Sequence, residues 1–440
     1  MHAPAAPSKV TTARVFAIAG PAMVANLTTP LIGIVSTSAV GRLGDAALLG
    51  GVAMASVIFD CMFWLFAFLR MSTVAFTAQS IGAGETDELR ALLARALVVA
   101  GLIGAALILL QLPLAAILLT TMGGSASATA AAKTYFAIRI WSAPLALGNY
   151  VVLGWLIGQA RAALALSVQV AINLVNMGVT VLLVLVLGAG IAGAAIAAVT
   201  AEAAGLLFGV LIARRLLRGR LTVSRATLFD RAKLMRMLAV NRDIMIRTAA
   251  LIAAFLFFTA QGARSGDVTL AANAVLNNFL LVSAFFLDGL ANAAEQLCGQ
   301  AFGARDKTAF SAATRLVVLW GLAFAVAVVF ALFGPHLIDI MTASIGVRSM
   351  ARNFLVFVVV SPLLAVFAFA FDGVYIGATW ARDMRNLMVA SLLIFLAAWL
   401  ALRSFGNAGL WCALLVHYAA RGGLEAARYP SLLRKSFATA

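Results

Sequence analysis

The chain has 440 residues, of which 64% are hydrophobic and only 11% are charged. A soluble protein of this size needs charged side chains over its whole surface, so the composition excludes a soluble globular protein and indicates a membrane protein. The net charge of +16 could suggest a nucleic-acid partner, but the basic residues gather in loops on one side of the predicted membrane protein. We therefore expect no nucleic acid to bind.

Twelve hydrophobic stretches follow one another along the chain, and a stretch of about 20 apolar residues crosses a bilayer as a helix. Lipid offers no partner to backbone N–H and C=O groups, and no stretch alternates as a barrel strand does, so all twelve should be helices. We expect them at 15–40, 46–70, 91–119, 134–158, 162–187, 190–213, 243–263, 270–300, 310–333, 350–376, 384–403 and 407–427. The predicted fold is an all-α polytopic membrane protein.

One clearly polar interval, 214–242, separates six stretches from six and is rich in arginine. The positive-inside rule places this interval in the cytoplasm, and the even number of spans places both termini there too. We divide the chain into an N-terminal lobe (1–213), a basic cytoplasmic linker (214–242) and a C-terminal lobe with a short cytoplasmic tail (243–440). The predicted location is the inner membrane of the cell.

The two halves repeat the same landmarks in the same order. In the first half these are residues 42–45, 79–84 and 153–158, and in the second half 264–267, 300–305 and 372–377. Glycine-rich helix ends also recur because small residues favour close packing, but the nearly constant offset favours a duplication. Two six-helix lobes of equal orientation should be related by a pseudo-twofold axis along the membrane normal, with substrate handled between them.

The sequence offers few residues for catalysis or metal binding. Cys61, Cys298 and Cys412 all fall in hydrophobic spans, where they fit buried thiols, and the chain has only three histidines. No disulfide or metal motif is present. We expect no metal site, no cofactor and no enzymatic activity.

Several polar residues fall at membrane depth, where ionisable groups are costly and usually functional. Asp288, Asn292 and Glu295 are spaced i, i+4 and i+7 in the eighth span, so they share one helical face that should line the cleft. Asp60 in the second span and Asp372 in the tenth are further acids. Carboxyl groups in such sites can exchange protons, and they favour a cationic or amphipathic substrate.

Neutral polar residues predict part of the cavity in the N-terminal lobe. Gln169, Asn173, Asn176 and Thr180 share one face of the fifth span, and Asn26 lies in the first span. Such stripes also serve simply to hold helices together. Glu202, in the sixth span, fits a structural role as well as a functional one.

Several strings along the chain are distinctive, namely Asn241-Arg242-Asp243-Ile244 and the segments 68–71, 77–79, 258–264, 287–295, 372–373 and 376–379. Together they resemble the DinF branch of the MATE (multidrug and toxic compound extrusion) family. The resemblance covers nearly the whole chain. It implies twelve helices in two lobes that open alternately to either side, with H⁺ or Na⁺ entry driving export of organic cations and drugs.

The chain departs from that family in its N-terminal lobe. DinF-type members generally carry an aspartate in the first helix, in a Val-Asp-Thr string linked to protonation, and Ser36 stands there in this chain. The fifth-helix aspartate of the family is also replaced, by Thr180. Asp372 matches a tenth-helix aspartate that NorM-type members use for cations. We expect coupling to rest on Asp60, Asp288, Glu295 and Asp372; the rival interpretation is a transporter with weak coupling.

The predicted function is secondary active efflux by a monomer. One alternative is a flippase for lipid-linked precursors from the same superfamily, but such proteins usually have fourteen helices and a basic cavity, whereas the buried charges here should be mostly acidic. The other alternative is a membrane-embedded enzyme, for which only His417 could supply a histidine base at membrane depth.

Overall fold

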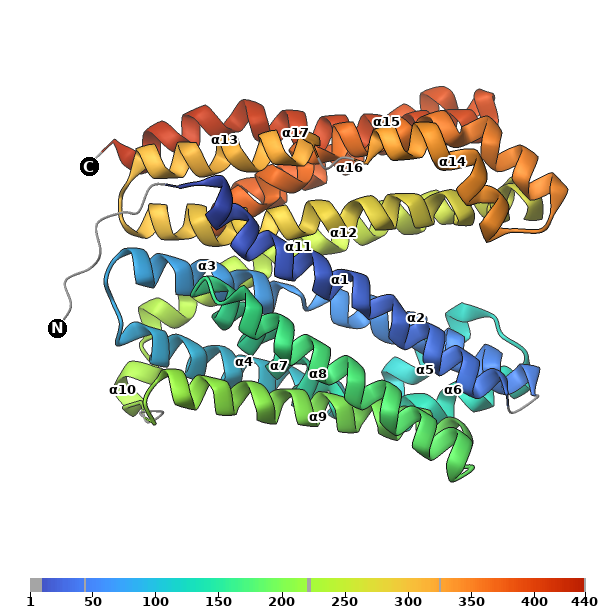
Figure 1. The fold of residues 1–440 in the computed structure, drawn as a ribbon, viewed down its shortest axis with the longest axis horizontal. Coiled ribbons are helices and arrows are strands. Elements are labelled where there is room, and N and C mark those ends of the chain that lie inside the picture. The colour runs from blue at the N-terminus through green and yellow to red at the C-terminus, as the bar shows by residue number, and fades with distance from the viewer. Residues whose placement is uncertain (1–9, 43–44, 220–222, 324–325, 439–440) are drawn as a thin grey trace. The chain divides into compact units, whose positions relative to one another are not determined.

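The computed structural model describes residues 10–42, 45–219, 223–323 and 326–438 (Figure 1). The remaining residues include Leu43 and Gly44 of the first repeated landmark and 220–222 of the predicted linker, which therefore lie outside the described residues. Within the described ranges the chain is almost entirely helical and contains no strand. The predicted all-α fold is confirmed.

The chain forms two compact units. The N-half unit comprises residues 24–80 and 85–238, and the C-half unit comprises residues 1–23, 81–84 and 239–440. The first turns of the chain belong to the C-half unit because they pack there: the Phe16 ring contacts the Trp320 ring edge to face at 4.9 Å, and the Arg14 guanidinium donates a 3.0 Å hydrogen bond to Gln300.

The helices are assigned as follows. Helices α1 (Thr12–Gly41) and α11 (Arg231–Arg264) each begin in one unit and end in the other. The N-half unit holds α2 (Ala46–Leu65), α3 (Phe68–Gly82, whose last residues count with the C-half unit), α4 (Glu88–Leu109), α5 (Gln111–Met122), α6 (Ala126–Arg139), α7 (Ala143–Gly158), α8 (Ala162–Thr180), α9 (Gly190–Leu216) and α10 (Arg225–Leu228). The C-half unit holds α12 (Asp267–Gly303), α13 (Lys307–Ala323), α14 (Ala327–Met341), α15 (Ile345–Gly377), α16 (Ala381–Leu402) and α17 (Gly406–Phe437).

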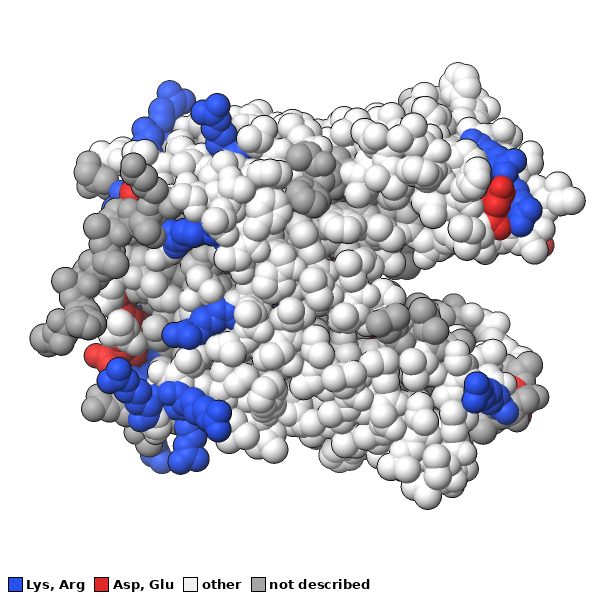
Figure 2. Space-filling model, viewed as in Figure 1, with Lys and Arg blue, Asp and Glu red and all other residues white. Residues whose placement is uncertain are grey.

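Twelve membrane crossings fit these helices. Ten helical segments of the described chain are long and apolar enough to cross a bilayer. One of them, Ala381–Phe437, is 57 residues long and contains two helices, α16 and α17, and the apolar helix α1 adds another crossing of 30 residues. On the face drawn in Figure 2, the charged side chains of each unit lie near the ends of its helices, as a membrane protein requires.

Several predicted spans prove to be two helices. The second span is broken between α2 and α3, where Phe66 and Ala67 donate short-range backbone hydrogen bonds to Phe63 and Trp64. No proline or glycine marks this break, so the hydrophobic pattern did not reveal it. The third, fourth and ninth predicted spans likewise divide into α4 and α5, α6 and α7, and α13 and α14.

Corresponding glycines pack in the same way in the two halves. A Cβ atom on Gly158 of α7 would lie 2.6 Å from the Cβ atom of Thr77 on α3, and one on Gly377 of α15 would lie 2.6 Å from the backbone oxygen of Glu295 on α12. Only glycine permits such a close approach. The repeated landmarks 153–158 and 372–377 therefore have a common structural cause, which supports the duplication.

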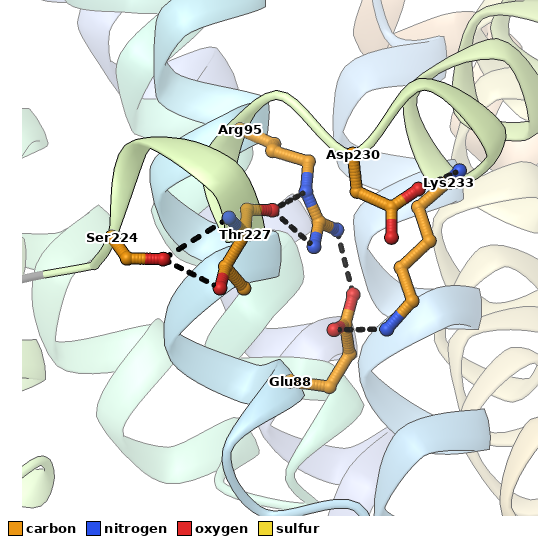
Figure 3. Close-up of polar contacts among 6 residues, drawn as sticks. All are labelled: Glu88, Arg95, Ser224, Thr227, Asp230 and Lys233. Carbon is orange, nitrogen blue, oxygen red and sulfur yellow. Dashed lines mark hydrogen bonds and ion pairs between the residues drawn. The ribbon is translucent and has the colours of Figure 1, made fainter.

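The predicted linker is largely ordered. From Arg231 onward it is helical and continues into the seventh span as α11, while α10 forms one short turn. Figure 3 shows how it is held within the N-half unit: Glu88 on α4 accepts hydrogen bonds of 2.6 Å from both Arg95 and Lys233, and Arg95 donates to the carbonyl of Thr227 at 3.1 Å. Ser224 caps the turn by accepting from the Thr227 N–H.

Candidate ion-coupling and substrate sites

A buried ion network lies in the C-half unit around Asp372. This aspartate is on α15 and is only 5% exposed, and its Oδ2 forms ion pairs with Arg247 on α11 and Arg421 on α17. Both arginines are also buried. Helices far apart in the sequence thus place three charged groups together in an apolar interior, as α15 packs against α17 (Figure 1).

Glu425 adds a second carboxyl group to the same region. It is fully buried one helical turn after Arg421, and both arginines act on it electrostatically. Neither of its carboxyl oxygens has a hydrogen-bond partner among the described residues. Its backbone carbonyl accepts a 2.8 Å hydrogen bond from the Tyr375 hydroxyl on α15.

Sequence reasoning missed Arg247, Arg421 and Glu425. The signal for both arginines is their position inside apolar stretches, where a basic residue is as informative as an acid. Acids are the majority of the buried charged groups, as expected, but only narrowly. Among the described residues the buried charged groups are four carboxylates and three arginines, namely Asp243, Glu295, Asp372, Glu425, Arg95, Arg247 and Arg421.

The predicted stripe on the eighth span corresponds to α12. Asp288 is exposed, whereas Asn292 is 7% and Glu295 only 2% exposed. The three residues therefore lead from an accessible position into the interior of the unit. Both acids act electrostatically on Arg247, which connects the stripe to the network around Asp372.

The polar stripe of the fifth span, on α8, forms a chain of hydrogen bonds. Gln169 donates to Asn173 at 3.0 Å, Asn173 donates to the Thr28 hydroxyl of α1 at 2.9 Å, and Thr180 lies 3.5 Å from Asn176. These contacts join α8 to α1 as a structural stripe would. Asn26 and Ser36, also on α1, are both half-buried.

A second cluster lies in the N-half unit near Asp60. The Arg139 guanidinium on α6 lies 3.8 Å from the carboxylate of Glu202 on α9 and acts electrostatically on Asp60. Asn149 donates a 2.7 Å hydrogen bond to the Glu202 carboxylate. Asp60 itself is exposed on the face of α2 that also carries Val57 and Trp64.

The protein is thus an all-helical membrane protein with a buried ion network in the C-half unit and a partly buried polar cluster in the N-half unit. The family model MatE matches residues 21–182 and 244–399, which together make up most of the chain. The chain belongs to the MATE family. Members of this family are transporters and not enzymes, and they act on small molecules without a cofactor.

The relatives place this MATE transporter in the DinF branch, as the motifs indicated. DNA damage-inducible protein F of Escherichia coli (strain K12) is 38% identical over 92% of this chain and 89% of its own length. Protein DETOXIFICATION 44, chloroplastic, of Arabidopsis thaliana is 24% identical over 92% of this chain and 80% of its own length.

Solved structures agree on the fold. A MOP superfamily transporter from Pyrococcus furiosus matches with a TM-score of 0.86 at 18% identity, over 96% of both chains. A multidrug resistance MATE family transporter of the MOP superfamily, in its outward-facing conformation, matches with a TM-score of 0.85 at 19% identity, also over 96% of both chains. At these identities the likeness extends to the fold alone.

Proposed function

We propose that this MATE transporter is a secondary active antiporter that exports organic cations, drugs or amphipathic compounds in exchange for H⁺ or Na⁺ by alternating access. The observation that carries the proposal is the buried network of Asp372, Arg247 and Arg421. Replacing such a network by apolar residues is often neutral or stabilising. Its presence at membrane depth is therefore better explained by transport than by stability.

The coupling sites are proposed on four acids. In the C-half unit the proposed coupling acids are Asp372, Glu295 and Asp288. Asp372 and Glu295 are buried and Asp288 is exposed, so the three together offer a route for an ion into the unit. Asp60 serves in the N-half unit, where Ser36 replaces the family's acid. Asn26, Gln169, Asn173, Asn176, Thr180 and Asn292 are proposed as cavity residues.

We further propose that the transporter works as a monomer in the inner membrane, with both termini in the cytoplasm. The concentration of arginine in 214–242 supports this orientation. The proposed lobes are 1–213 and 243–440. Their boundaries differ from those of the compact units because α1 and α11 each run from one unit into the other.

The test is transport by purified protein in liposomes under separately imposed H⁺ and Na⁺ gradients. Ethidium should move against its gradient when one of the two ions flows in the opposite direction, and a drug-dependent pH change should accompany H⁺ coupling. Movement that follows neither gradient would contradict antiport.

A flippase for lipid-linked precursors is a second candidate, because two buried arginines, Arg247 and Arg421, accompany the buried acids of the C-half unit. The Pyrococcus furiosus transporter is described as having a binding pocket of reverse polarity that suggests a different function. Basic groups in a cavity would suit a pyrophosphate. Lipid-linked substrate that crosses liposomes without an ion gradient, together with inactivity toward ethidium, would favour this candidate.

A further inference from the structure

Glu425 has surroundings that an ionised carboxylate does not tolerate. It is fully buried, and both of its carboxyl oxygens lack a hydrogen-bond partner within the described residues. The two arginines that act on it electrostatically are both paired with Asp372 instead. The hydrogen bond from Tyr375 to the Glu425 carbonyl fixes this turn of α17 against α15.

The free energy of burial points to a neutral glutamic acid. An isolated ionised carboxylate in an apolar interior costs several kcal/mol, so such a group takes up a proton instead. An ionised Glu425 would attract Arg421, because opposite charges four residues apart on a helix meet on one face. The Nε atoms of Arg421 and Arg247 have no partner among the described residues, so each arginine has a donor to offer.

We propose that Glu425 is a proton-binding residue of the transport cycle, and that its proton and a cationic substrate at Asp372 exclude one another. The proposal rests on the antiport function proposed above and adds the residue and the electrostatic link that would enforce exchange. The proton leaves the Glu425 carboxyl group for bulk water, and no covalent bond other than O–H changes.

Charge balance explains why the two ligands would compete. With Glu425 neutral, Arg247 and Arg421 both stay on Asp372 and the site carries one more positive charge than with Glu425 ionised, so a further cation binds more weakly. With Glu425 ionised, Arg421 can turn to it, and the Asp372 carboxylate gains a face for a cation. One proton released would therefore admit one cation.

Other charged and titratable groups around Glu425 decide which arginine moves. They are Asp372 and Tyr375 on α15, Asp383 on α16, which pairs with Arg428 at 2.9 Å, His417 on α17, and Asp288 and Glu295 on α12, which act on Arg247. Asp288 acts on both arginines, and Glu295 acts on Arg247. Arg421 is the arginine expected to turn, because it lies on the same helix as Glu425, four residues earlier and on the same face.

The experiment measures binding of tetraphenylphosphonium to the purified full-length protein by calorimetry over a range of pH. In the wild type, affinity should fall as the pH falls, by up to about tenfold per pH unit where one proton is exchanged. Glu425→Gln mimics the protonated acid, so it should bind weakly at every pH and release about one proton fewer per cation. Glu425→Asp should retain proton release.

Infrared difference spectroscopy supplies a readout that does not depend on affinity. Binding of the probe to the wild type should remove a band of a protonated carboxyl group, and Glu425→Gln should lack this change. The control is Asp339→Asn, which removes a partly exposed carboxylate of α14 paired with Arg348 and Arg352 and should bind as the wild type does.

The outcomes separate this inference from the proposed function. If the wild type binds no tetraphenylphosphonium, the cationic substrate class fails and the inference falls with it. If the wild type binds the probe and folded Glu425→Gln keeps the wild-type pH dependence and infrared band, only the role of Glu425 is overturned.

Discussion

Arg247 and Arg421, on helices α11 and α17, bind the same oxygen of one carboxylate, Oδ2 of Asp372. Replacing this carboxylate by an amide would leave two buried arginines without their acid.

Asp372→Asn should therefore abolish coupled ethidium efflux and also lower the free energy of unfolding, by about 3–5 kcal/mol. The two effects can be separated by measuring thermal unfolding in detergent beside transport in liposomes. Asp372→Asn combined with Arg421→Gln should recover part of the stability but no transport. A single variant that exports ethidium normally would show that the network is structural.

Asp288→Asn should reduce transport with a smaller loss of stability than Asp372→Asn, because Asp288 is exposed on α12 whereas Asp372 is buried. Asn292→Ala, one helical turn along the same stripe, should affect transport less. Efflux from vesicles at several pH values provides the comparison. Normal export by Asp288→Asn at every pH would remove Asp288 from the coupling path.

Asp60→Asn tests whether the N-half unit carries a coupling acid. If Asp60 has replaced the first-helix acid of the family, the variant should impair vesicle efflux, and Ser36→Asp in the same chain should restore part of it. Full recovery is not expected, because Asp60 is exposed whereas Ser36 is half-buried. Full activity of Asp60→Asn would end this hypothesis.

Glu88→Gln should loosen the linker from α4. It removes the charge that Arg95 and Lys233 share, and hydrogen bonds to charged groups are each worth about 1.5–3 kcal/mol. Hydrogen exchange of the backbone around Thr227 should become faster. The neighbouring Asp87→Asn is the matched control, since Asp87 is 91% exposed and pairs only with Arg90 among the described side chains, so it should change nothing.

Membrane orientation can be tested with single cysteines in a background that lacks Cys61, Cys298 and Cys412. Residues of 214–242 should stay unlabelled by an impermeant thiol reagent in intact cells. Cysteines near Lys133 or Arg348 should be labelled from outside. External labelling of the linker would reverse the predicted topology.

The hydrophobic pattern predicted the helical membrane fold and approximately where each span lies, because bilayer thickness limits span length. It could not locate the break at Phe66, where neither proline nor glycine interrupts the apolar run. The hydrophobic pattern also could not identify the partners of buried charges. Asp372 was recognisable as an acid at membrane depth, but that Arg421 lies beside it depends on how α15 and α17 pack.

Inactivating mutations in this transporter should not be confined to residues that carry charge. Gly377 has no chemistry of its own, yet any side chain there would meet the backbone of α12 and push α15 outward. Asp372 lies five residues earlier on the same helix and would be displaced with it. A random-mutagenesis screen for lost drug resistance should thus recover substitutions at Gly377 beside those at Asp372, and the first class should be rescued by lower growth temperature while the second is not.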